Sequence, residues 1–558
     1  MPFIAHPMHA CPSFSSWMNS GLWKGLLKDD FDLASIDYSK VKAPIQILLM
    51  GSAAKLTGPK VKTVFLEDLP PEEAAKVAPE PSGLVNLGNT CYLNSVVQCL
   101  RAADPLRKSL ASYAGPSSSN GGASGAGLAD QSNAVFVTTL RDLYRNLDRT
   151  TEAVQPTQVV MSTKMSFPEF ARTGPQGQPM QQDAEEFYSG LLNIAAQELR
   201  GPGAIAAGFN GRTVGDKELM GANNLIDAAF GMKLEETLTC DETAVMAAGA
   251  AGDDAMDVDA AAATAGVVEP PVKMYDTARK LVCNIQGGAD ASSQVNVNHI
   301  AEGIELSLNG KVEKRSDVLG RDAVWSKKTR IARLPPILTV QFGRFYWKET
   351  PDSQDHAGVK CKVMKPVAFS GTLDVYDFCT EEVQKVLKKA RDKALAEEED
   401  RINRKLRGED AKKETGDGDE AMMDTDDKTE EAAAAGGSGG DEEDDEALKA
   451  ALAMSVEEEL APVGPGLPDN FQGQYELFAV VTHKGRDADG GHYMAWVRAD
   501  KPEGSPEAEK IADSDETNDD WYVFDDDEVS PCKTEDVLKL KGGGDWHMSY
   551  LNFYRCKK

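Results

Sequence analysis

The order of helix-like and strand-like segments limits the folds open to this chain more than any other feature. From residue 84 to about 200 the apolar residues recur mostly at helical spacing, and the runs after them read largely as strands. Strand patterning resumes at QYELFAVVTHKG, after a charged tract at about 392–470. Because strands return there, the tract reads as an insertion within one domain rather than a spacer between two. The expected fold class is α+β, with helices first and an antiparallel sheet later.

The expected strands are short apolar runs bounded by Gly, Pro or charged residues. They are MKLEETLTC, GIELSLNG, RLPPILTVQFGRFYW, QYELFAVVTHKG, GGHYMAWVRAD, DWYVFDDDEV and SYLNFYRC. Two segments, 244–272 and about 392–470, are so rich in Ala, Gly and charged residues that they predict disordered insertions. The Gly-rich residues 201–222 are interpreted as a third insertion, and GPSSSNGGASGAG at 115–127 as a flexible break.

The amino end of the chain has its own pattern. IQILLMG at 45–51 and KTVFLEDL at 62–69 read as strands. A Pro-containing linker follows at 70–82. The predicted organisation is therefore a first region at 1–69, the linker, and one large domain at 83–558.

Composition argues against several classes of protein. The formal net charge of −30 makes nucleic acid a poor partner and suits a basic protein surface better. No apolar run of about 18 residues predicts a membrane span, and the start MPFIAHPMHACPSF lacks the pattern of a secretory signal. The nine cysteines are odd in number and include no CxxC pair, which favours a reducing compartment and argues against a structural zinc. We expect a cytoplasmic protein, with the nucleus as a second location, and no metal or cofactor.

One cysteine stands where a glycine-containing loop turns into a helix. The segment GLVNLGNTCYLNSVVQCLR at 83–101 has Gly and Asn residues before Cys91 and apolar residues at helical spacing after it. The positive end of a helix dipole favours a thiolate at such a place. A nucleophilic cysteine also needs a base, and the base needs an orienting group.

His492 is the candidate base among the seven histidines. It follows Gly490 and Gly491, which allow a substrate backbone to approach closely, and it opens the strand HYMAWV. Further along the chain, FDDDEV offers Asp525 as a partner for the imidazole. A cysteine with a distant histidine and aspartate is a weak signal by itself. On these residues alone, a buried core cysteine remains the alternative for Cys91.

Four segments together resemble the ubiquitin-specific proteases. GLVNLGNTCYLNSVVQCLR is similar to the cysteine box of that family, and VVTHKGRDADGGHYMAWVR with WYVFDDDEV resembles its histidine box. QQDAEEFYSGLL and RLPPILTVQFGRFYW resemble two segments that lie between these boxes, in the family's order. The resemblance implies a papain-like cysteine protease of thumb–palm–fingers architecture. It also implies hydrolysis of isopeptide or peptide bonds at the C-terminal glycine of ubiquitin.

Other segments resemble the branch of this family that associates with the proteasome and carries an N-terminal ubiquitin-like domain. They are KTVFLEDLPPEE, LLMGSA and GGGDWHMSYLNFY. The resemblance implies ubiquitin, polyubiquitin chains and the 26S proteasome regulatory particle as partners, with no nucleic acid or membrane partner. Residues 27–69 resemble only the second half of a ubiquitin-like domain, and 1–20 do not read as its opening hairpin. A partial β-grasp segment is therefore expected at the amino end.

The resemblance assigns roles to four residues. Cys91 is the nucleophile, His492 is the general base and then the acid for the leaving amine, and Asp525 orients His492. Asn86, five residues before the cysteine, matches the residue that donates to the oxyanion.

Alternatives stay open beside these roles. Asn86 could merely hold the loop before the cysteine. Asp526 could orient the imidazole in place of Asp525. His483, in the same box as His492, could line the channel for the ubiquitin tail or cap a turn, and is the less favoured base.

Residues outside the catalytic set are assigned more loosely. Gln182, Asp183 and Gly491 are expected to border the channel for the ubiquitin tail. For Gln182 and Asp183, an ordinary helix start is an equal alternative. Structural roles are expected for Cys99, Trp546 and His547.

The charged tract contains one further motif, DEEDDEALKAALAMSVEE at 441–458. An acidic run precedes Leu448, Ala451, Leu452 and Ser455, which fall on one helical face. This resembles a ubiquitin-interacting motif, in which Ala451 would allow close approach to ubiquitin and Ser455 would hydrogen-bond at the rim. An acidic, alanine-rich segment that turns helical by propensity alone is the alternative.

Two rival functions are weighed against hydrolysis of ubiquitin conjugates. A ubiquitin-binding scaffold without catalysis is disfavoured by the presence of Cys91, His492 and Asp525 together. A general papain-like peptidase is disfavoured by the family segments.

Overall fold

The computed structural model describes most of the chain after residue 80. The described residues are 81–115, 128–174, 176–210, 222–243, 268–286, 295–349, 358–407, 463–468, 470–488, 490–500 and 518–557. All of them belong to the unit Pro70–Lys558. The expected region at 1–69, with its partial ubiquitin-like segment, lies outside the described residues. No helix in the described part of the chain is long and apolar enough to cross a membrane.

The first part of the described chain is helical, as predicted. It contains α3 (Cys91–Arg101), α4 (Asp104–Ser112), α5 (Leu128–Leu147), α6 (Thr157–Ser166), the 3-10 turn η5 (Pro168–Ala171), α7 (Ala184–Glu198), α8 (Gly201–Gly208) and α9 (Leu225–Ala229). Leu93, Val97 and Leu100 recur at helical spacing on α3 and are fully buried. They share one core with Phe136 of α5 and Phe187 of α7.

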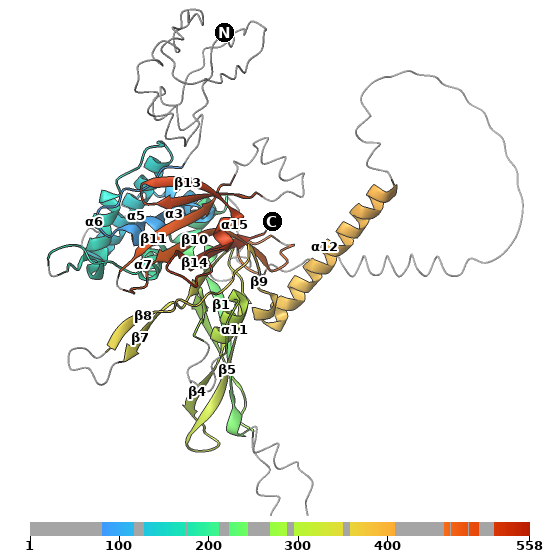
Figure 1. The fold of residues 1–558 in the computed structure, drawn as a ribbon. Helices are drawn as coiled ribbons and strands as arrows, with labels where there is room; N and C mark the ends of the chain where they lie inside the picture. Colours follow the sequence, from blue (N-terminus) through green and yellow to red (C-terminus); the bar gives the residue numbers. More distant parts are fainter. Residues whose placement is uncertain are drawn as a thin grey trace, which may run out of the picture. The chain divides into compact units, whose positions relative to one another are not determined.

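Eight strands form the large sheet, in the order β13-β12-β11-β10-β14-β6-β3, with β9 beside β10. They are β3 (Leu281–Cys283), β6 (Ile337–Phe342), β9 (Thr372–Asp374), β10 (Gln474–Lys484), β11 (His492–Arg498), β12 (Asp520–Asp525), β13 (Glu528–Lys533) and β14 (Met548–Cys556). Its neighbouring strands are antiparallel, as predicted, except that β3 and β6 are parallel. Helix α3 packs against β10, β11 and β12 (Figure 1), so the start of α3 lies next to this sheet.

A second sheet of four strands has the order β2-β1-β5-β4. Its strands are β1 (Met232–Cys240), β2 (Val272–Ala278), β4 (Asn309–Arg315) and β5 (Asp322–Arg333), and Figure 1 shows them projecting from the rest of the fold. A separate hairpin pairs β7 (Phe345–Glu349) with β8 (Gly358–Lys362), and α15 (Thr534–Leu538) follows β13. The mixed α+β class is confirmed, and the arrangement is consistent with the catalytic domain expected from the resemblance.

One predicted strand is wrong. GIELSLNG was expected to be extended, but α11 (Ile300–Leu308) covers most of it. Ile300, Ile304 and Leu308 recur every four residues and are buried, and His299 and Glu302 form a capping box at the helix start. A short apolar run satisfies both the strand period and the helix period, so the burial of one helical face decides between them here.

The insertions are also shorter than predicted. Helix α12 runs from Glu381 to Arg407, and so enters the tract at about 392–470 that was expected to be disordered. At the other end of this tract, Val463 and Leu467 are buried. Charged helix formers such as Glu, Lys and Arg make a solvated helix resemble disorder in composition. Helix α8 likewise forms at the start of the Gly-rich insertion, and its Ile205 is buried.

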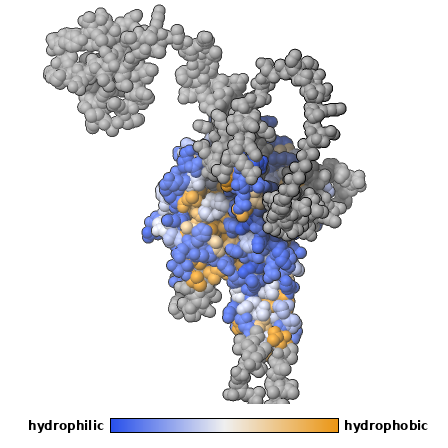
Figure 2. Space-filling model, turned by 90° about the vertical axis from the view of Figure 1, so that its right-hand side faces the viewer, coloured by the Kyte–Doolittle hydropathy of each residue, from blue (hydrophilic) through white to orange (hydrophobic). Residues whose placement is uncertain are grey.

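The surface of the described residues is largely hydrophilic on the face seen in Figure 2, with hydrophobic side chains gathered in a few patches. Exposed large apolar side chains include Met274 and Tyr275 of β2 and Trp347 of β7. Single exposed apolar residues are normal on a soluble surface, so they carry no assignment by themselves.

A buried arginine joins three segments near the large sheet. Arg344 is 0% exposed and donates through Nε to the carbonyl of Ser549 (2.6 Å). Its two Nη atoms donate to the carbonyls of Val363 (3.2 Å), Lys365 (3.1 Å) and Lys541 (3.2 Å). Burial lowers the pKa of Arg344 to about 10. The guanidinium stays charged at neutral pH and satisfies four carbonyls on segments far apart in the sequence.

Replacing this arginine is expected to destabilise the protein strongly. Arg344→Met should lower the free energy of unfolding by about 3–5 kcal/mol, because it removes four hydrogen bonds from a buried site. Urea unfolding measures the change. Arg486→Met is the matched control, because Arg486 is exposed and pairs with Asp545 on the surface, where ion pairs contribute little. Equal losses in the two variants would contradict this account of Arg344.

Candidate active site

Cys91 is the first residue of α3 and is 3% exposed. The chain reaches it through Gly88 and Asn89, which have positive φ angles of 96° and 52°. Asn86 closes this turn, because its Oδ1 accepts hydrogen bonds from the backbone N–H of Gly88 (2.9 Å) and of Thr90 (3.2 Å). The loop therefore holds the sulfur at the positive end of the α3 dipole, where negative charge is favoured.

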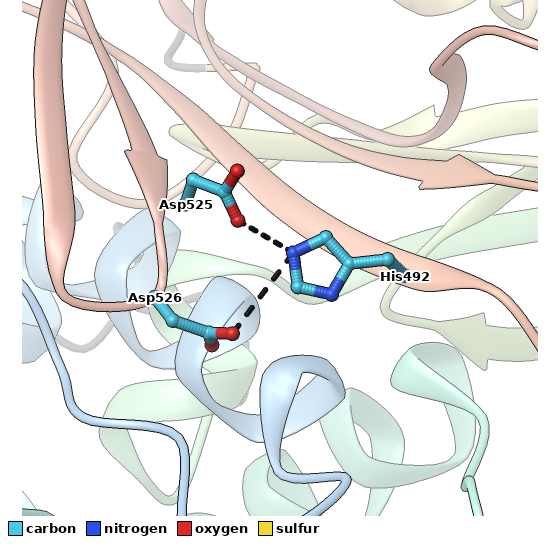
Figure 3. Close-up of side chains that lie close together, drawn as sticks. All are labelled: His492, Asp525 and Asp526. Carbon is cyan, nitrogen blue, oxygen red and sulfur yellow. Dashed lines mark hydrogen bonds and ion pairs between the residues drawn. The ribbon is translucent and has the colours of Figure 1, made fainter.

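His492 and Asp525 come from neighbouring strands of the large sheet. His492 begins β11 and Asp525 ends β12. Since these neighbouring strands are antiparallel, both residues lie at the same end of the strand pair. Nε2 of His492 lies 2.6 Å from Oδ1 of Asp525 (Figure 3). Oδ2 of Asp526 lies 3.9 Å from the same nitrogen. Of the two candidate partners, Asp525 makes the hydrogen bond.

The other ring nitrogen of His492 serves Cys91. The hydrogen bond with Cys91 is the largest cause that raises the pKa of His492, to about 9; burial opposes the rise, and the hydrogen bond with Asp525 adds to it. Asp525 engages Nε2, which leaves Nδ1 as the ring nitrogen available to the sulfur. At neutral pH the imidazolium is therefore favoured between a sulfur and a carboxylate. Such an arrangement supports a thiolate–imidazolium pair.

Asp526 has different partners from its neighbour. Its Oδ2 accepts from Nδ2 of Asn86 and its Oδ1 from Nδ2 of Asn94, each at 2.8 Å. Its backbone oxygen accepts from the N–H of Leu84 (2.8 Å). Asp526 is 9% exposed and has a φ of 54° in the turn between β12 and β13. It ties this turn to the segment that carries Cys91.

Gln181 contacts Cys91, although the sequence pattern did not single it out. Its Nε2 lies 3.2 Å from Sγ of Cys91. The predicted channel residue was its neighbour Gln182, which is half-buried just before α7. Two adjacent glutamines give the same signal in a sequence, so only the direction of the side chains distinguishes them. Asn94 was missed for a similar reason, since an Asn within an apolar helix has no distinctive spacing.

Asp183 has the contacts of a helix start and more. Its side chain caps α7 by accepting from the backbone N–H of Glu185 (2.8 Å). It also accepts from the hydroxyl of Tyr550 (2.7 Å), and its Oδ2 lies 3.6 Å from Nζ of Lys360. These contacts join α7 to β14 and to the β7–β8 hairpin, and they fix the segment just after Gln181.

Gly491 stands at a turn that accepts no side chain. Its φ is 98°, and a Cβ there would lie 2.2 Å from the carbonyl oxygen of Lys484 and 2.7 Å from Cε1 of His483. His483 is buried, and its Nε2 lies 2.9 Å from the oxygen of Gly490. Burial, and then the charge of Lys362, lower the pKa of His483 to about 3. His483 is therefore a neutral, structurally engaged ring rather than the base beside Cys91.

The residues expected to be structural differ in burial. Cys99 is fully buried in the core around α3, and burial raises its pKa far above the usual range. His547 is 4% exposed, lies 3.1 Å from Oγ1 of Thr482 through Nδ1, and has its pKa lowered to about 4, mainly by burial. Trp546 differs from both: it is 64% exposed, with Nζ of Lys484 4.8 Å from its ring centre.

The residues of the expected ubiquitin-interacting motif and the possible metal ligands differ in whether the structure describes them. Leu448, Ala451, Leu452 and Ser455 lie outside the described residues. Within the described ranges, the one His/Cys/Asp/Glu cluster compact enough for a metal ion consists of His492, Asp525 and Asp526. Within this cluster, His492 is hydrogen-bonded to Asp525, and Asp526 is hydrogen-bonded to Asn86 and Asn94.

Comparison with known proteins shows which protein family the chain matches. The family model described as ubiquitin carboxyl-terminal hydrolase matches residues 82–554. Ubiquitin carboxyl-terminal hydrolase 6 of Arabidopsis thaliana is 32% identical over 96% of this chain and 89% of its own length. A protein of the same name from Schizosaccharomyces pombe is 29% identical over the same shares. Ubiquitin carboxyl-terminal hydrolase 14 of Caenorhabditis elegans is 28% identical over 93% of this chain and 82% of its own length.

Proposed function

The chain belongs to the ubiquitin carboxyl-terminal hydrolase family and is a cysteine-type hydrolase of that family, and we propose that Cys91, His492 and Asp525 carry out the hydrolysis. The proposed substrates are isopeptide and peptide bonds at the C-terminal glycine of ubiquitin. The observation that carries the proposal is the position of His492, whose Nε2 lies 2.6 Å from Oδ1 of Asp525 and whose pKa is raised most by Cys91. Cys91 lies at the start of a helix, where a thiolate is favoured.

In the first half of the proposed reaction, Sγ of Cys91 attacks the carbonyl carbon of the ubiquitin glycine. The sulfur reacts as the thiolate while His492 holds the proton, the C–S bond forms, and the carbonyl electron pair moves to the oxygen, which takes the negative charge. His492 then gives the proton to the amine nitrogen as the C–N bond breaks, which leaves ubiquitin as a thioester. Asp525 holds the ring and stabilises the imidazolium.

In the second half, a water molecule gives a proton to His492 and adds to the thioester carbonyl. The C–S bond breaks as its electron pair returns to the sulfur, the new carboxylic acid of ubiquitin releases its proton to solvent, and the thiolate returns beside the imidazolium. Asn86 is proposed as an oxyanion donor through the second N–H of its amide, because the first is donated to Asp526. Gln182, Asp183 and Gly491 are proposed to border the channel for the ubiquitin tail, since they adjoin Gln181 and His492 in the chain.

The test of this function uses purified full-length protein and three substrates. A fluorogenic amide of the ubiquitin C-terminus and isopeptide-linked di-ubiquitin should both be cleaved. A short fluorogenic peptide with the same C-terminal residues should not be cleaved, which separates this function from that of a general peptidase. Tight ubiquitin binding without cleavage of either ubiquitin substrate would overturn the proposal in favour of a binding scaffold.

We further propose that the enzyme trims ubiquitin from substrates bound to the 26S proteasome regulatory particle. The support is the resemblance of KTVFLEDLPPEE, LLMGSA and GGGDWHMSYLNFY to the proteasome-associated branch. Purified regulatory particle should co-sediment with the protein and raise its rate of reporter cleavage. A protein that neither co-sediments nor changes its rate would contradict the proteasome assignment while leaving the hydrolase intact.

The motif at 441–458 is proposed as a second ubiquitin contact. Leu448→Ala combined with Ala451→Asp should weaken binding of polyubiquitin chains by about 10-fold or more, because a tethered second site raises effective concentration. Cleavage of the mono-ubiquitin reporter should stay unchanged. Lys449→Ala, on the same segment but off the Leu448–Ala451 face, is the matched control. Unchanged chain affinity in the double variant would remove this motif from the account.

A further inference from the structure

The nucleophile has a side-chain donor other than His492. Nε2 of Gln181 lies 3.2 Å from Sγ of Cys91, and Gln181 itself is half-buried. An amide nitrogen has only N–H groups to offer, so in this contact Gln181 is the donor and the sulfur is the acceptor. The donor is therefore directed at the atom that bonds to the substrate.

The position of Gln181 is fixed by its surroundings. Two residues later, Asp183 caps α7 and accepts a hydrogen bond from Tyr550. The backbone of a residue next to a capped helix start has little freedom to move, so the amide needs only a small side-chain movement when charge develops beside it. This is what distinguishes Gln181 from a glutamine on a free loop.

The other amide at the site is largely committed elsewhere. Oδ1 of Asn86 accepts from the N–H groups of Gly88 and Thr90, and its Nδ2 donates to Asp526 at 2.8 Å. These contacts hold the loop before Cys91. Even when its second N–H reaches the oxyanion, Asn86 supplies one donor, and a tetrahedral oxyanion accepts more than one hydrogen bond.

We propose that Gln181 is a further catalytic residue, whose amide N–H moves from the sulfur of Cys91 to the substrate oxygen as that oxygen becomes negative. The inference rests on the proposed function of Cys91. When the C–S bond forms, the carbonyl electron pair moves to the oxygen, which is bonded to the same carbon as the sulfur. A donor in contact with the sulfur is therefore within reach of that oxygen after a small movement. Gln181 keeps its proton throughout, and only its hydrogen bond changes partner.

Two reactions of Cys91 separate this role from simple packing against the thiol. Hydrolysis of the ubiquitin C-terminal amide passes through an oxyanion. Alkylation by iodoacetamide does not, because the sulfur displaces iodide directly. An oxyanion donor affects only the first reaction, whereas a residue that merely holds or activates the thiol affects both.

The experiment compares Gln181→Ala and Gln181→Glu with wild type, using the full-length protein. Both variants should lose about 10²–10³-fold in kcat for the ubiquitin amide, the loss typical of removing one oxyanion donor, with KM nearly unchanged. Gln181→Glu is close in shape to wild type, but its carboxylate accepts and does not donate. Alkylation of Cys91, followed on its own peptide by mass spectrometry, should stay within about threefold of wild type in Gln181→Ala. Gln176→Ala, an exposed residue of the preceding loop, is the control for both reactions.

Two results would overturn the proposal. One is a kcat of Gln181→Ala or Gln181→Glu within about threefold of wild type. The other is a loss of alkylation in Gln181→Ala as large as the loss of hydrolysis. Failure of the underlying function looks different, since then the wild type itself would not turn over the ubiquitin amide, or Cys91→Ala would still do so.

Discussion

The Cys91→Ala protein is expected to lose about 10⁶-fold in kcat for ubiquitin substrates, which puts hydrolysis below detection. Removing the sulfur removes the only atom that forms the thioester in the proposed reaction. Ubiquitin affinity should stay within a few-fold of wild type, because Cys91 is 3% exposed and offers little surface for binding. Reporter hydrolysis and the ubiquitin dissociation constant, measured on the same preparation, test the loss of hydrolysis and the retained affinity.

Cys99→Ala is the matched control for this variant. Cys99 lies on the same helix, is fully buried and faces the core. Its replacement should cost some stability through a small cavity but leave kcat close to wild type. Hydrolysis above background by Cys91→Ala, or an equal loss in Cys99→Ala, would refute the assignment of the nucleophile.

The second large effect is expected at Asp525. Asp525→Asn should lower kcat by about 10²–10⁴-fold, because an amide cannot stabilise the imidazolium and can select the wrong tautomer of His492.

The pH profile of kcat should change as well. The pKa of His492 is raised to about 9, so wild-type activity persists at alkaline pH and falls as the imidazolium loses its proton near pH 9. Asp525 helps to raise the pKa of His492, so in Asp525→Asn the fall of activity at alkaline pH (the alkaline limb of the profile) should move to lower pH.

Asp526→Asn distinguishes the two neighbouring carboxylates. Asp526 hydrogen-bonds Asn86 and Asn94 and lies 3.9 Å from Nε2 of His492, beyond hydrogen-bond distance, so this variant should lose about 1–3 kcal/mol of stability through weakened buried hydrogen bonds. Its alkaline limb should stay at the wild-type pH. A shift of that limb in Asp526→Asn, with none in Asp525→Asn, would show that Asp526 is the orienting residue.

The elements that carry the main site residues could be predicted from the sequence because the signals are local. Apolar residues at helical spacing follow Cys91, and an unbroken run of buried residues follows His492, so each begins a regular element. Tertiary contacts could not be predicted in the same way. Asp525 and Asp526 are adjacent, yet Asp525 hydrogen-bonds His492, whereas Asp526, which has a positive φ at the turn, hydrogen-bonds Asn86.

The wrong predictions have a common physical cause. In α11 and α12 the deciding contribution is burial of a narrow apolar face, through Ile304 in one case and Leu387 in the other. A run of residues such as IELSL or a charged, alanine-containing tract does not reveal which neighbour will cover that face. Gln181 belongs to the same class, since only the packing of the α7 start against the large sheet shows which glutamine meets the thiol.

The most direct test of the central claim is reaction with ubiquitin that carries an electrophile at its C-terminus, followed by mapping of the adduct. One ubiquitin per molecule should attach, through a thioether to Cys91, and the adduct should disappear in Cys91→Ala. The electrophile alone, without ubiquitin, should label the protein far more slowly. An adduct on any other cysteine, or undiminished labelling of Cys91→Ala, would contradict the assignment of Cys91 as the nucleophile of a ubiquitin hydrolase.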